Sequence, residues 1–119
     1  MRAFHNITLN EMDEFLRHRG FTPIHLPNVK EHVYGKVVYP KITVRVYTGI
    51  VGEDSKERGT DAIRVVAMKR MQDGIIRPVT PSDSKVYRLE NWRESLTIRI
   101  NNVIDLVFDD IQAKREAYV

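Results

Sequence analysis

Two stretches that are rich in β-branched residues carry arginine, and one of them also tyrosine, at positions an even number of residues apart. Arg45 and Tyr47 lie in KITVRVYTGIV. Arg64 and Arg70 lie in DAIRVVAMKRM. Since side chains on a strand alternate between two faces, residues two apart share a face. Cations contact phosphates and aromatic rings stack on bases, at about 1–3 kcal/mol per base, so strands with this pattern suit a single nucleic acid strand.

A third stretch and a charged loop extend this candidate set. Alternation in EHVYGKVVY puts Tyr34 and Lys36 on one face and Val33 and Val37 on the other, and we expect helices to cover the Val33 face. The loop at 52–61 would lie at the rim of the opposite face. The expected contact residues are Tyr34, Lys36, Arg45, Tyr47, Lys56, Arg58, Arg64 and Arg70. The same residue types also suit a solvated sheet face, or one buried in an oligomer.

The charge distribution favours the same middle part of the chain. The net charge is +3, but residues 30–99 hold 14 Lys or Arg against 9 Asp or Glu. A basic segment raises the expectation of a polyanionic partner. The end of the chain is more acidic, with Asp105, Asp109 and Asp110 on one segment. These carboxylates could hold a hard cation, although a solvated acidic helix face is the preferred interpretation.

No catalytic or cofactor motif is present. The histidines, His5, His18, His25 and His32, lack the spacing of metal ligands, so we predict no metal site. A phosphate-binding glycine loop, a nucleophile elbow and a zinc-protease helix are all missing from the sequence. We therefore predict no catalytic residue and no cofactor. A role without catalysis is the preferred interpretation, although a nuclease site made of scattered carboxylates and lysine would assemble only in three dimensions.

Length and composition predict one domain over residues 1–119. Its 42% hydrophobic and 29% charged residues are ordinary for a globular protein. The chain has no cysteine, which excludes disulfides and thiolate chemistry. No stretch approaches the roughly 20 apolar residues of a membrane span. We expect a soluble cytoplasmic protein.

The first element to position these residues is a helix predicted over 9–19. Thr8 and Glu11 have the spacing of a capping box, and Gly20 can end the helix. After it, FTPIHLP predicts an edge strand or an extended connector, because it contains prolines. EHVYGKVVY, KITVRVYTGIV and DAIRVVAMKRM then predict an antiparallel sheet. Asp73 and Gly74 indicate a hairpin that leads into IIRPV, an edge strand, and KVYRL could add a short strand.

The last element is a long helix that begins near Asn91. An apolar stripe recurs at steps of three or four: Trp92, Leu96, Ile100, Val103, Val107 and Ile111. Residues 96–100 could instead form a last strand, but we prefer the long helix. The predicted fold class is therefore α+β, with an N-terminal helix, an antiparallel sheet of three to five strands and a C-terminal helix packed on one sheet face.

Function is less constrained than the fold. The leading hypothesis is a nucleic-acid-binding domain with low sequence preference that binds single-stranded DNA or RNA through the sheet face and the 53–61 loop. Such a domain could act as a homo-oligomer. The alternative is a small protein-interaction or assembly domain without nucleic-acid binding. A metal-dependent nuclease ranks third. None of the three involves a membrane.

Overall fold

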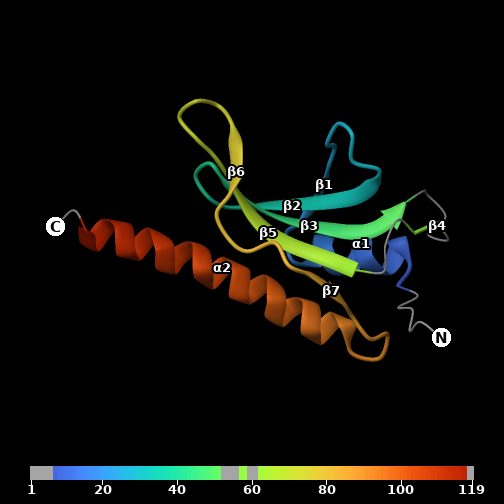
Figure 1. Cartoon of the computed structure of the whole chain (residues 1–119). Coiled ribbons are helices and arrows are strands. Elements are labelled where there is room, and N and C mark those ends of the chain that lie inside the picture. The colour runs from blue at the N-terminus through green and yellow to red at the C-terminus, as the bar shows by residue number, and fades with distance from the viewer. Residues whose placement is uncertain (1–6, 52–56, 59–61, 118–119) are drawn as a thin grey trace.

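An antiparallel sheet and two helices make up the protein in two layers. The computed structural model describes residues 7–51, 57–58 and 62–117. Helix α1 (Leu9–His18) and the long helix α2 (Trp92–Ala117) lie on the same face of the sheet (Figure 1). This arrangement confirms the predicted α+β class, with a long C-terminal helix packed against one sheet face.

The sheet is built from neighbouring antiparallel strands in the order β1-β2-β3-β5-β6, while β4 pairs with β3 and β7 pairs with β5. The bounds are β1 (Thr22–Ile24), β2 (Glu31–Tyr39), β3 (Ile42–Val51), β4 (Glu57–Arg58), β5 (Ala62–Arg70), β6 (Ile76–Pro78) and β7 (Ser84–Val86). FTPIHLP and IIRPV thus form the edge strands that their prolines predicted.

Helix α1 begins where its sequence predicts and ends at His18, one residue before the predicted end. The Thr8 Oγ accepts a hydrogen bond from the Glu11 backbone N–H at 3.2 Å, and the Glu11 carboxylate accepts one from the Thr8 N–H at 3.0 Å. This capping box supplies partners for backbone donors that the helix itself leaves free. At the other end, Gly20 has a φ of 85°, which a residue without a Cβ adopts easily.

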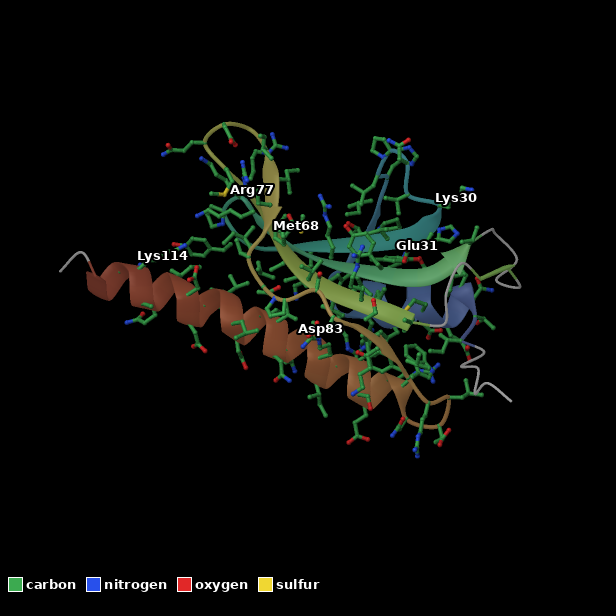
Figure 2. All side chains as sticks on the ribbon, in the orientation of Figure 1. Lys30, Glu31, Met68, Arg77, Asp83 and Lys114 are labelled. Carbon is green, nitrogen blue, oxygen red and sulfur yellow. The ribbon has the colours of Figure 1, made fainter. Side chains whose placement is uncertain are left out.

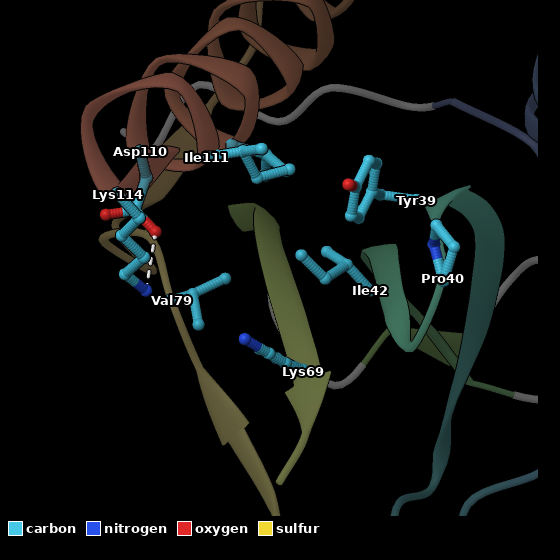
Figure 3. Close-up of a pocket in the computed structure, with 9 residues that line it drawn as sticks. Tyr39, Pro40, Ile42, Lys69, Val79, Asp110, Ile111 and Lys114 are labelled. Atoms are coloured by element: carbon cyan, nitrogen blue, oxygen red, sulfur yellow. Dashed lines mark ion pairs between the residues drawn. The ribbon is translucent and has the colours of Figure 1, made fainter. Parts of the chain in front are cut away.

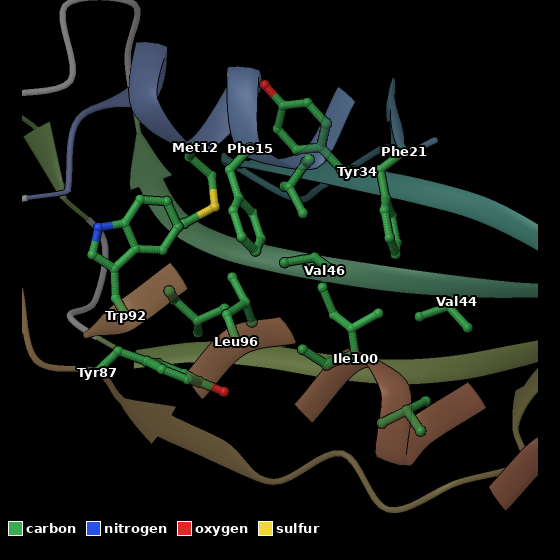
Figure 4. Packing of buried hydrophobic residues seen from close by; sticks show 14 of the residues in the cluster. Met12, Phe15, Phe21, Tyr34, Val44, Val46, Tyr87, Trp92, Leu96 and Ile100 are labelled. Atoms are coloured by element: carbon green, nitrogen blue, oxygen red, sulfur yellow. The ribbon is translucent and has the colours of Figure 1, made fainter. Parts of the chain in front are cut away.

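The helices and the sheet share one hydrophobic core (Figure 4). Phe15 of α1 packs against Trp92 at the start of α2, with ring centroids 5.0 Å apart and planes tilted by 58°. Residues 96–100 are helical, so the alternative of a last strand there is wrong. The buried residues of α2 follow the predicted stripe: Trp92, Leu96, Ile100, Val103 and Val107.

The turn between β2 and β3 and the hairpin between β5 and β6 lie at the same end of the sheet. Lys41 connects β2 to β3 with a φ of 69°, in the left-handed region. Gly74, with a φ of 83°, lies in the β5–β6 hairpin that Asp73 and Gly74 predicted. The Asp73 carboxylate accepts a hydrogen bond from the Ile75 N–H at 2.9 Å and fixes this turn.

The two faces of β2 are reversed relative to the expectation: the face with Tyr34 and Lys36, and not the face with Val33, lies under the helices. Tyr34 pairs with Val46 and Lys36 pairs with Val44, and both valines belong to the core under the helices. Tyr34 and Lys36 therefore lie on the helix-covered face, and their assignment to the open face is wrong. The physical reason is that both side chains are amphipathic. The Tyr34 ring is buried while its hydroxyl reaches Asp13 of α1 at 2.6 Å, and Lys36 Nζ lies 6.0 Å from the Phe21 ring centroid.

Because the Tyr34 hydroxyl bonds to Asp13, the free energy of unfolding should depend on pH in the acid range. Its hydrogen bond is the main cause that holds the pKa of Asp13 below the usual 3.8; burial opposes this shift, and Arg17 supports it. A carboxyl whose pKa is lower in the folded protein stabilises the fold above its unfolded pKa, and this stability is lost as the pH falls through the folded value.

Tyr34→Phe should therefore destabilise the protein by about 1 kcal/mol near neutral pH, because Asp13 loses a hydrogen bond donor. The difference from wild type should shrink as the pH falls well below 3.8. Urea unfolding over a pH series measures this. Tyr39→Phe, which removes the same hydroxyl from the end of β2, serves as the control. If Tyr34→Phe lost the same stability at every pH, the contact with Asp13 would not be the source of that loss.

Candidate nucleic-acid interface

The sheet face turned away from the helices carries the arginines of β3 and β5. We call it the open sheet face. Figure 2 shows Met68 on this face, between the β5–β6 hairpin that carries Arg77 and the β1–β2 connection at Lys30. Its residues follow from the strand register: Val33, Gly35 and Val37 of β2, Thr43, Arg45 and Tyr47 of β3, and Arg64, Val66, Met68 and Arg70 of β5.

Arg45, Tyr47 and Arg64 form one contact group on the open sheet face. Arg45 Nη1 donates to the Tyr47 hydroxyl at 3.2 Å, and the Arg64 guanidinium lies 4.1 Å from the Tyr47 ring centroid. Arg64 is partly exposed between the buried Ile63 and Val65, as its strand position predicted. The Tyr47 ring thus holds a cation at its hydroxyl and another on its face.

Tyr47 itself is only 8% exposed, which contradicts the expectation that it faces solvent. It belongs to a second, small hydrophobic cluster with Val33 and Val66. Leu26 and Val29 of the β1–β2 connection pack against this cluster and help to cover it. The ring is therefore a support for the two arginines and is too buried to stack on a base.

A basic groove lies beside this group, with a cavity volume of about 150 Å³. We call it the sheet groove, and it is lined by Val37, Lys41, Thr43, Arg45, Met68, Arg70 and Ile76. Its charged residues, Lys41, Arg45 and Arg70, are all cations, and no carboxylate of the described residues lines it. A cavity with charges of a single sign attracts and concentrates anions.

The structure brings together part of the predicted site. Arg45, Arg64 and Arg70 lie on the open sheet face as expected. Lys56 lies outside the described residues, and of Arg58 only the backbone is described, in β4. Lys41 was not among the predicted contact residues, although it is the first residue of KITVRVYTGIV and therefore lies at the end of that predicted strand.

The remaining sequence hypotheses concern metals and membranes. Within residues 7–51, 57–58 and 62–117, no group of three or more His, Asp or Glu residues could hold a metal ion. On α2, the Asp110 carboxylate pairs with Lys114 Nζ at 3.0 Å. Neither described helix is both long and apolar enough to cross a membrane.

Comparisons with protein-family models, with curated proteins and with solved structures found no match for this chain. Its function therefore has to be inferred from the chemistry of the open sheet face.

Proposed function

We propose that this protein binds single-stranded nucleic acid with little sequence preference, through the sheet groove and the arginines beside it. The observation that carries this proposal is the convergence of Lys41, Arg45 and Arg70 in one groove that no carboxylate of the described residues lines. The phosphates of a bound strand would supply the negative charges that carboxylates supply in an ordinary network of ion pairs.

The arginines suit phosphate contacts. A guanidinium carries five N–H donors, and the bond from Arg45 to Tyr47 uses only part of this capacity. Arg64 is held against the Tyr47 ring, so less side-chain freedom is lost when it binds a phosphate. Phosphate contacts carry no sequence information, which accounts for the low sequence preference.

Aromatic stacking contributes less than the sequence suggested. Because Tyr47 is buried and Tyr34 lies under the helices, neither ring is available to the bases. The proposed mode of binding is therefore electrostatic, with Tyr47 as a positioning residue for Arg45 and Arg64. Affinity should fall steeply with salt, as it does for proteins that bind through phosphates.

Arg45→Ala, Arg64→Ala and Arg70→Ala should each weaken binding of a labelled single strand. For each phosphate that a variant no longer binds, the slope of log affinity against log salt should become shallower by about 0.7. Arg88→Ala is the matched control, because it removes the same charge from the exposed connection between β7 and α2. Titrations at several salt concentrations measure both quantities, with melting temperatures to check that each variant is folded.

The rival hypothesis is an assembly domain, and the exposure of Val37, at 70%, beside the groove favours it. Large exposed apolar residues often mark protein contacts. If wild type fails to bind any strand at low salt and its size in solution rises with concentration, the assembly function replaces the proposed one. If the arginine variants bind like Arg88→Ala, the open sheet face is not the binding site.

A further inference from the structure

A second, larger groove lies at the end of the sheet, where the β2–β3 turn meets the β5–β6 hairpin. Its cavity volume is about 860 Å³. We call it the hairpin groove, and it is lined by Pro40, Lys41, Lys69, Arg70, Met71, Gln72, Asp73 and Arg77. None of these residues belongs to the hydrophobic core under the helices.

The two grooves share a boundary, and the hairpin groove extends from it toward the opposite face of the sheet. Lys41 and Arg70 line both of them. In the register of β5 and β6, Lys69 lies opposite Arg77, and the next residue, Arg70, lies opposite Ile76. Because neighbouring side chains on a strand alternate, Lys69 and Arg77 point to the face opposite Arg70. Figure 3 shows Lys69 in a pocket beneath α2, which agrees with this direction.

Cations dominate the hairpin groove as well. Lys41, Lys69, Arg70 and Arg77 line it together with the carboxylate of Asp73. The Asp73 carboxylate lies 3.5 Å from Arg77 Nη2, and both side chains are about half exposed. An ion pair this exposed is weak and is screened by salt. Arg77 can therefore exchange Asp73 for a phosphate at little cost.

We infer that a bound strand runs from the sheet groove, over Lys41 and Arg70, around the end of the sheet and into the hairpin groove. This inference rests on the proposed function and adds the path of the strand. The path bends from one sheet face toward the other. Double-stranded DNA, with a persistence length of about 50 nm, resists such a bend. The path therefore selects a flexible single strand over a duplex.

Lys69→Gln and Arg77→Gln test the path, because they remove charge but keep much of the side-chain length. With a strand of about 16 nucleotides, at the upper end of the usual site size, each variant should bind about fivefold more weakly. A strand of about 4 nucleotides, at the lower end of the usual site size, should lose less affinity, because it can bind in the sheet groove, which neither Lys69 nor Arg77 lines. Asp73→Asn should strengthen binding of the long strand, because it frees Arg77 while the amide oxygen can still accept from the Ile75 N–H.

The outcomes separate this inference from the proposed function. If Arg45→Ala weakens binding of the short strand but Lys69→Gln, Arg77→Gln and Asp73→Asn leave binding of the long strand unchanged, the path is wrong and the sheet groove remains the site. Equal or tighter binding of a duplex of the same length also overturns the path. If wild type binds neither strand at low salt, the proposed function itself fails.

Discussion

Val103→Asp is expected to unfold the protein. The Val103 side chain is 0% exposed and packs in the core between α2 and the sheet. A carboxylate there would be buried without a partner, which costs several kcal/mol, against a total stability of about 5–15 kcal/mol for a typical domain. Val107→Asp, at another buried position of the same stripe, should act in the same way.

Leu106→Asp is the matched control for this prediction. It places the same charge on the same helix, but at a side chain that is 44% exposed. The control should change the melting temperature little, while the Val103 variant should lose the cooperative thermal transition followed by circular dichroism. A normal melting temperature for Val103→Asp would mean that α2 does not pack on the sheet through this stripe.

Tyr47→Ala should have the second largest effect, on both stability and binding. The ring is buried between the β1–β2 connection and the sheet, and removal of a large buried aromatic ring costs about 3–5 kcal/mol. The same change also removes the surface on which Arg64 rests and the hydroxyl that accepts from Arg45. We therefore expect a lower melting temperature together with weaker binding.

Tyr47→Phe separates these contributions. It keeps the ring in the cluster and under Arg64, and it removes only the hydrogen bond with Arg45, which is worth about 1 kcal/mol. The phenylalanine variant should thus melt only a few degrees below wild type and well above Tyr47→Ala. Urea unfolding and strand titration of both variants measure the two effects. If Tyr47→Ala were as stable as wild type, the ring would not be part of a core.

The sequence predicted those elements whose signals are local. Thr8, Glu11 and Gly20 define α1 through contacts a few residues apart, and Asp73 with Gly74 defines the hairpin. The faces of β3 and β5 were also predicted, because apolar residues there alternate with polar ones. In each case the information lies within one short segment of the chain.

The parts that were wrong or missed depend on distant segments. Tyr34 was assigned to the open face because its sequence neighbours do not show that Asp13 of α1 accepts a hydrogen bond from its hydroxyl. Tyr47 is buried because Leu26 and Val29 lie over its cluster, and nothing near Tyr47 in the sequence indicates this. The pairing of Lys69 with Arg77 depends in turn on the hairpin register.

The left-handed backbone of Lys41 has a consequence for the balance between stability and function. For a residue with a Cβ this backbone conformation lowers the stability of the fold by about 1–2 kcal/mol, whereas glycine adopts it without strain. Glycine at this turn would therefore suit the fold better than lysine does. Lysine instead brings an ammonium group to the boundary of the sheet groove and the hairpin groove. Lysine at this turn therefore lowers folding stability but places a positive charge where the proposed nucleic acid strand crosses the end of the sheet.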